Sequence, residues 1–180
     1  GIYNLNGSPE ITNCTISDNS ASRSGGGMYN VATSNSTANP TLTNCIISGN
    51  SASSISSIEG GGGIYNYSDE GTASPTLIDC IITDNSAISD GGGMLNENGS
   101  SPTLTNCTFT NNTADDNGGG MFNQNNSSPT LTDCTFTNNT AENNGGGMCN
   151  GGGSPTLENC TFENNTVTVT GGGMLNNNSS

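Results

Sequence analysis

Apolar residues are sparse in this chain, but they recur at fixed positions. Each repeat carries a cysteine, a leucine or isoleucine three residues before it, and an isoleucine or phenylalanine two residues after it. The repeated cysteines are Cys14, Cys45, Cys80, Cys107, Cys134 and Cys160. They are 31, 35, 27, 27 and 26 residues apart, so the basic unit is about 27 residues long and the early units have longer loops. Such a period predicts a solenoid, in which each unit buries its apolar face against the next unit.

The order of residues within each unit predicts short strands separated by bends. A period of two puts the cysteine and the following Ile or Phe on one face of a strand, and the residue between them on the other face. The three-residue step from Leu to Cys breaks this alternation, and the Asn or Asp before each cysteine suits a left-handed bend. No segment has an apolar period of 3.6 residues, which excludes helix. We therefore predict an all-β fold: a single-stranded parallel β-helix (β-solenoid) with about six coils of roughly 27 residues and three short strands per coil.

Two further columns consist of asparagine. The first lies five residues after each cysteine and comprises Asn19, Asn50, Asn85, Asn112, Asn139 and Asn165. The second follows a glycine triplet and a Met or Ile, and comprises Asn30, Asn66, Asn96, Asn123, Asn150 and Asn176. Stacked amides can hydrogen-bond from coil to coil and satisfy polar groups at the bends. We expect both columns to form ladders.

The repeats run through the whole sequence as one array. The repeat cores lie near 8–30, 39–66, 74–96, 101–123, 128–150 and 154–176, within one continuous solenoid over residues 1–180. The sequence starts with GIYN and stops with GMLNNNSS, both inside a repeat. We expect a fragment of a longer chain, or a protomer whose ends meet other copies.

One column suggests an interaction surface. The residue after each inward Met or Ile should point outward, and these residues are Tyr29, Tyr65, Leu95, Phe122, Cys149 and Leu175. An exposed apolar stripe marks an interface in many proteins. We predict a lateral interface along this column; the alternatives are that loops cover it or that the register is shifted by one residue. If the column is exposed, Cys149 would be an exposed thiol.

The other cysteines are expected to be structural. They form one column with one residue per coil, and the sequence has neither a CxxC pair nor a histidine, so the spacing of zinc ligands is missing. Stacked residues keep their Cβ atoms about 4.8 Å apart, longer than the roughly 3.8 Å that a disulfide prefers. We expect free thiols that act as small core residues.

Composition limits the partners. Leu, Ile, Val and Phe make up only 27 of 180 residues, which is typical of disordered chains unless the apolar columns stack. The net charge is −14 with Arg23 as the only basic residue, so nucleic acid and anionic membranes are poor partners. No apolar stretch approaches the roughly 20 residues of a membrane span. No cofactor is predicted, and calcium at turn carboxylates is a weak alternative.

The motifs resemble those of a known family. GGGMFN at 118–123 and FTNN at 109–112 are similar to the GGA(I/L/V) and FxxN repeats of chlamydial polymorphic outer membrane proteins, and more broadly to right-handed parallel β-helix repeats of bacterial and archaeal surface proteins. Gly replaces the Ala of GGA throughout, and Ile replaces Phe in the first three coils. The resemblance implies a right-handed, surface-exposed rod that adheres or assembles.

Three functions follow from these patterns. The first is a non-catalytic extracellular or cell-surface rod of a bacterium or archaeon, which self-associates end to end or laterally, or adheres to glycans or a host surface. The second is a carbohydrate-binding or polysaccharide-degrading β-helix; we predict no catalytic residues, because neither Asp79 with Asp133 nor Asp115 with Asp116 recurs with supporting groups. The third is an ice-binding solenoid, suggested by Thr-x-Thr segments such as 108–110 and 135–137. Several Asn-x-Thr sequons also permit glycosylation, best placed at Asn111, Asn138 and Asn164.

Overall fold

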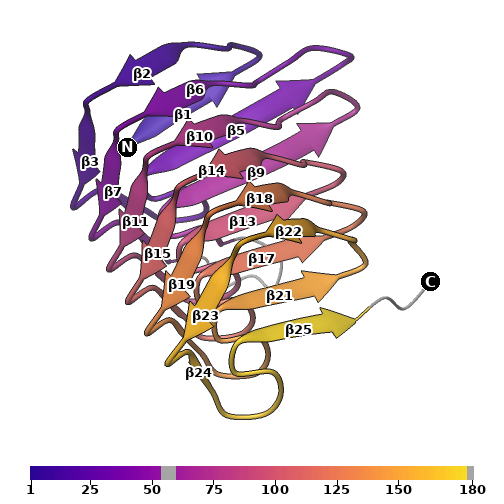
Figure 1. The fold of residues 1–180 in the computed structure, drawn as a ribbon. Helices are drawn as coiled ribbons and strands as arrows, with labels where there is room; N and C mark the ends of the chain where they lie inside the picture. Colours follow the sequence, from indigo (N-terminus) through magenta and orange to yellow (C-terminus); the bar gives the residue numbers. More distant parts are fainter. Residues whose placement is uncertain (54–59, 178–180) are drawn as a thin grey trace.

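The computed structural model describes residues 1–53 and 60–177, which wind into a rod of stacked coils (Figure 1). All regular structure in these residues is β-strand, and equivalent strands of successive coils pair in parallel. The predicted all-β parallel β-solenoid is therefore confirmed. Residues 54–59 of the predicted repeat core 39–66, and residues 178–180 of the array, lie outside the described residues.

Sheet A is built from the strands that follow the glycine triplets. Its order is β1 (Ile2–Leu5), β5 (Met28–Thr33), β9 (Ile64–Asp69), β13 (Met94–Glu97), β17 (Met121–Gln124), β21 (Met148–Gly151) and β25 (Met174–Asn177). Met94 pairs with Met121 and Asn96 with Asn123, and the same register holds along the sheet. Each column of the sequence is thus a physical column in the rod.

Two more sheets flank the bend that precedes each cysteine. Sheet B contains β2 (Glu10–Thr12), β6 (Thr41–Thr43), β10 (Thr76–Ile78), β14 (Thr103–Thr105), β18 (Thr130–Thr132) and β22 (Thr156–Glu158). Sheet C contains β3 (Thr15–Ser17), β7 (Ile46–Ser48), β11 (Ile81–Thr83), β15 (Thr108–Thr110), β19 (Thr135–Thr137) and β23 (Thr161–Glu163). Sheets A, B and C supply the three predicted strands of each coil.

A fourth sheet lies beyond the second bend. Sheet D contains β4 (Ser20–Ala21), β8 (Ser51–Ala52), β12 (Ser86–Ala87), β16 (Thr113–Ala114), β20 (Thr140–Ala141) and β24 (Thr166–Val167). Its strands are only two residues long, too short to show a period in the sequence. They pair because sheet C, which precedes them in each coil, already aligns successive coils in register.

The bends adopt the left-handed conformation that the sequence predicts. The residues before the cysteines have φ between 52° and 55°, including Asn106 and Asp133. Those before the first asparagine ladder are also left-handed, with Asn111 and Asn138 both at 56°. Asn and Asp tolerate this region better than other side chains do. Strands B, C and D therefore meet at fixed corners, which keep the coils superimposable.

The interior of the rod is filled by apolar columns. One core cluster joins the Met/Ile column of sheet A, the Leu column of sheet B, the Ile/Phe column of sheet C and the cysteines between the last two. Met121, Leu131 and Phe136 have no exposed surface. The rings of Phe109 and Phe136 stack with centroids 4.7 Å apart, so each aromatic residue packs on the one above it. A few apolar residues per coil thus form one continuous core.

The first asparagine ladder hydrogen-bonds each coil to both of its neighbours. The side chain of Asn112 donates to the carbonyl of Ile82 and to Oδ1 of Asn139, both at 2.9 Å. Its own Oδ1 accepts the backbone N–H and the side-chain amide of Asn85 at 3.1 and 3.0 Å. Equivalent amide contacts of about 3.0 Å run from Asn19 to Asn165. The buried amides therefore have partners for all their polar groups.

The second asparagine ladder lies on the inward face of sheet A. Each side chain donates to Oδ1 of the next, for example Asn66 to Asn96 and Asn96 to Asn123, both at 2.7 Å. Asn4, which the sequence pattern did not include, begins the ladder with a 3.0 Å bond to Asn30. Asn30, Asn66, Asn96, Asn123 and Asn150 are fully buried. The interior is therefore mixed, with amide ladders beside apolar columns.

The glycine triplets allow backbones to touch. Gly118 has φ of +65°, which favours glycine. A Cβ on Gly119 would lie 2.3 Å from the carbonyl oxygen of Thr140 and 2.6 Å from that of Gly146. The second and third glycines of each triplet also donate N–H groups to the next triplet. Side chains are excluded here because the neighbouring coil occupies their place.

We expect Asn112→Ala to destabilise the chain. The substitution removes the hydrogen bond to the buried carbonyl of Ile82 and leaves the buried N–H of Asn85 without its partner, which costs about 1–3 kcal/mol. Urea unfolding followed by circular dichroism measures the loss. Thr105→Ala, at an exposed outward position, is the matched control and should change the free energy of unfolding by less than about 0.5 kcal/mol. Equal effects of the two substitutions would contradict the ladder.

We expect Gly119→Ala to cost roughly 3 kcal/mol, because its methyl group meets two backbone carbonyls that cannot rotate away. Thermal and urea unfolding give the measurement. Gly151→Ala is the control, since its Cβ would meet only the ring of Phe122, at 3.3 Å. If Gly119→Ala unfolds at the same urea concentration as Gly151→Ala, the coils do not approach as closely as described.

Candidate functional site

The predicted lateral stripe is covered along its middle. Tyr65, Leu95, Phe122 and Cys149 are buried, with 3%, 0%, 7% and 4% of their surface exposed, while Tyr29 and Leu175 are partly buried. These residues do point away from the main core, as the alternation predicts, but they form a second cluster with Tyr67 on the outer side of sheet A. The prediction of an exposed interface, and of Cys149 as an exposed thiol, is wrong for this part of the rod.

The cover comes from the loops that lead into the glycine triplets. The first glycine of each triplet turns its backbone onto the outward side chain: a Cβ on Gly118 would lie 2.7 Å from Cβ of Phe122, and one on Gly91 would lie 2.9 Å from Cβ of Leu95. In Figure 1 these loops curl beneath sheet A beside the sheet D strands. Burial raises the pKa of the Cys149 thiol to about 12, which keeps it protonated and unreactive at neutral pH.

The outer cluster contains a buried acid paired with a tyrosine. Oη of Tyr65 donates to Oε2 of Glu97 at 2.6 Å, and both residues are at least 95% buried. Asn125 donates to the other carboxylate oxygen at 3.4 Å. Burial, together with the neighbouring carboxylate, raises the pKa of the Tyr65 phenol well above its usual value. The sequence pattern placed Tyr65 on the stripe but gave no indication of its pairing with Glu97.

A second buried acid lies in the covering loops. Asp90 is 6% exposed and accepts the backbone N–H and the side-chain amide of Asn117, both at 2.9 Å. Burial raises the pKa of Asp90 to about 6, and the nearby carboxylates of Asp116 and Glu97 add to the shift. Oδ1 of Asn117 in turn accepts from the side-chain amide of Asn144. The column that holds Asp90 in one coil therefore holds asparagine in the next two. Alignment of the loops could have identified Asp90 as the acidic member of this column.

The cysteine column lies at the corner between sheets B and C. All seven cysteines are free; Cys45, Cys80, Cys107 and Cys134 are buried, Cys160 is intermediate and Cys14 is exposed. The thiol of Cys107 faces the carbonyls of Leu77 and Thr105 at 3.5 and 3.3 Å. Contacts with the thiols of Cys134 and Cys80, and then burial, raise its pKa. Cysteine suits this corner because it is small and apolar yet can donate weakly to two carbonyls.

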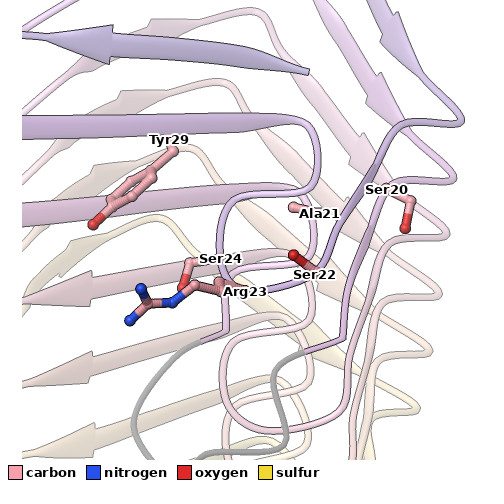
Figure 2. Close-up of a pocket in the computed structure, with 6 residues that line it drawn as sticks. All are labelled: Ser20, Ala21, Ser22, Arg23, Ser24 and Tyr29. Carbon is pink, nitrogen blue, oxygen red and sulfur yellow. The ribbon is translucent and has the colours of Figure 1, made fainter.

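A depression opens beside the first coil of the stripe. It has a volume of about 500 Å³ and is lined by 20–24 and Tyr29. Figure 2 shows Arg23 and Tyr29 projecting toward the same side, with Ser24 beside Arg23. The ring of Tyr29 stacks on Tyr65 at 4.8 Å and makes a T-shaped contact with Tyr3 at 5.5 Å. Its neighbours therefore hold the ring in place beside the depression.

One polar atom in this depression has no partner. The hydroxyl of Ser24 is buried and makes no hydrogen bond within the described residues. Because a buried unpaired hydroxyl is unfavourable, it is suited to a polar ligand or water. Among the described residues, the lining offers hydroxyls, one guanidinium and a phenol.

The remaining acidic candidates do not converge. Asp79 and Asp133 are exposed at bends two coils apart in one column, and Asp116 accepts a bond from Asn143. Across residues 1–53 and 60–177, no group of three or more His, Cys, Asp or Glu side chains is arranged to hold a metal ion. The expectation of calcium at turn carboxylates has no candidate ligand set in this part of the chain.

Comparison with known families identifies the architecture. A family model described as "Right handed beta helix region" matches residues 1–180, the whole sequence. The chain belongs to this right-handed β-helix family. Comparisons with curated proteins and with solved structures found no match.

Membership of the right-handed β-helix family gives the hand of the coil, which strand patterns alone do not determine. The narrower resemblance to chlamydial polymorphic outer membrane proteins is not confirmed. Within the described part of this β-helix, no helix is long and apolar enough to cross a membrane.

We expect the β-helix to lose stability as the pH rises from about 4 to about 6. The pKa of Asp90 is raised from 3.8 to about 6 on folding, so across this window the folded chain keeps a proton that the unfolded chain has lost. The contribution of Asp90 to the free energy of unfolding is therefore largest below pH 4. Above pH 6 it levels off at a value roughly 3 kcal/mol lower.

Asp90→Asn should flatten this pH dependence and stabilise the chain at pH 7, because the amide oxygen still accepts from Asn117 without a buried charge. Urea unfolding at pH 4, 5, 6 and 7 measures both effects. Asp133→Asn removes one negative charge at an exposed bend and should leave the dependence in place. A wild-type stability that does not change over this range would contradict the assignment.

Proposed function

We propose that this β-helix is a non-catalytic structural rod of an extracellular or cell-surface protein, used for adhesion or assembly. The observation that carries the proposal is the unbroken register of all four sheets, which repeats the same lateral face at every coil. The amide ladders and glycine contacts hold neighbouring coils together, which favours a stiff rod. Repetitive stiff surfaces suit binding to extended partners more than to single small molecules.

The surface location rests on sequence properties. A net charge of −14 with one basic residue keeps the rod soluble and away from nucleic acid. The GGG(M/I)xN and FxxN motifs resemble those of chlamydial surface proteins, and this resemblance supports a passenger-like role outside the cell.

Self-association is part of the same proposal. Because every coil has the same columns, an unpaired coil edge of one rod would be complementary to that of another, and parallel edges pair readily. Lateral association through the Tyr29 to Leu175 column is no longer favoured, since its middle is buried. The end-to-end mode remains the one to test.

A second candidate is carbohydrate binding at the depression beside Tyr29. The unpaired hydroxyl of Ser24 favours it, together with the hydroxyls of Ser20 and Ser22 in the lining. A sugar carries many hydroxyls that could pair with these groups. Binding here would give an adhesive rod its ligand without requiring catalysis.

Small-angle scattering tests the rod, and we expect an elongated particle whose length increases with protein concentration. Sedimentation velocity separates association from shape. Immobilised polysaccharides then test adhesion. Ser24→Ala is the variant expected to weaken binding, and Ser86→Ala, at an exposed position of sheet D outside the depression, is its control. A compact particle would contradict the rod, and release of reducing sugar from any polysaccharide would contradict a non-catalytic role.

A further inference from the structure

The outward face of sheet B carries a two-dimensional array of threonines. Its first column consists of Thr41, Thr76, Thr103, Thr130 and Thr156, which pair in register from strand to strand. Its second column consists of Thr43, Ile78, Thr105 and Thr132 in the same strands. The leucine between the two columns points into the core. We call this set the threonine array.

The spacing of the array is set by the backbone. Neighbouring strands lie about 4.8 Å apart, and residues two apart on one strand lie about 6.6 Å apart. Because threonine is β-branched, its χ1 angle is restricted, so hydroxyl and methyl groups repeat with little disorder. Thr103, Thr105, Thr130 and Thr156 are exposed, and the other threonines of the array are partly exposed. The face therefore offers a regular grid of hydroxyls and methyls to solvent.

The array is neutral and its hydroxyls are available. In the described residues, no hydrogen bond involves the side-chain hydroxyl of Thr76, Thr103 or Thr130. The four strands β6, β10, β14 and β18 carry no charge, although the chain as a whole has a net charge of −14. Glu10 and Glu158 stand only in the outer strands β2 and β22, and Asp79 and Asp133 lie at the bend beside the sheet. Because the central strands of this face carry no charge, we expect its partner to be neutral as well.

The shape of the face narrows the partner further. The depression described above is lined by residues outside sheet B, so it is separate from this face. The face has no aromatic ring on which a sugar could stack. What it offers is a flat lattice of hydrogen-bonding hydroxyls and methyls, and its partner should be flat, periodic, neutral and made of hydrogen-bonding groups. Crystalline water has these properties.

We propose that the threonine array binds ice. The hydroxyls would take the places of water molecules at the ice surface, while the methyl groups between them order the adjacent water. The face of sheet C continues the pattern around the corner, with Thr108 and Thr110 beside Thr135 and Thr137. This activity does not depend on the rod adhering to a glycan or to itself.

The test uses the whole chain in three measurements: adsorption of fluorescently labelled protein to a growing ice hemisphere, thermal hysteresis, and ice recrystallisation. We expect the wild-type chain to enter the ice, to produce thermal hysteresis and to slow recrystallisation. The double variant Thr103→Tyr with Thr130→Tyr should lose all three activities, because two bulky rings break the grid. Tyrosine is a good strand former, so the variant should keep its circular dichroism spectrum and melting temperature.

Thr113→Tyr is the matched control. It makes the same change at an exposed strand residue of sheet D, outside the array, and should leave ice adsorption unchanged. Exclusion of the wild-type chain from ice, or full adsorption of the folded double variant, would overturn the proposal. A third outcome would also overturn it: the wild-type chain binds microcrystalline cellulose but not ice, and the double variant loses the cellulose binding. The array would then recognise a glycan.

Discussion

Coil-to-coil hydrogen bonding by buried asparagines is the interaction on which this rod depends. Each coil bends sharply after the Ile/Phe column, and beyond the bend the backbone N–H of the ladder asparagine hydrogen-bonds to a side chain of the next coil. The side chain of Asn112 donates to the carbonyl of Ile82 in the coil before it, and its Oδ1 accepts the backbone N–H of Asn85. Each asparagine also accepts from its neighbour, so the ladder is satisfied only when all coils are in register. Register then places the apolar columns over one another, which lets a chain poor in large apolar residues build a core.

Sheet A shows how the same geometry makes a second buried layer. The left-handed first glycine turns the preceding loop over the outward side chains, so residues such as Leu95 and Phe122 are covered by backbone from their own coil. This cover brings Asp90 and Glu97 out of water. Glu97 is compensated by the hydroxyl of Tyr65, and Asp90 by two donors from Asn117. The rod therefore carries acidic groups whose burial costs stability at neutral pH.

With sheet A covered, the surface available for partners moves to sheets B, C and D. Their outward positions hold threonine, serine and isoleucine in columns with very few charges. A neutral periodic face and a polar depression beside Tyr29 are different kinds of site, and they suit different partners. Both are properties of single rods, whereas end-to-end association is a property of the coil edges. A structural rod can hold these functions on separate faces because its register, not its surface, determines its stability.

The sequence by itself determined the repeat, the number of coils, the strand positions around each cysteine and the left-handed bends. These are local properties: an alternation of two, a residue type that tolerates positive φ, and a column that recurs without exception. It also predicted which side of sheet A the residues from Tyr29 to Leu175 face. Only the tertiary structure decided that this side is buried. The loop that covers it has no apolar pattern of its own, and its position depends on the left-handed turn of the backbone at the first glycine of the triplet. The pairing of Tyr65 with Glu97 and the burial of Asp90 were likewise beyond sequence reasoning, since those partners lie in different coils and meet only when the solenoid is wound.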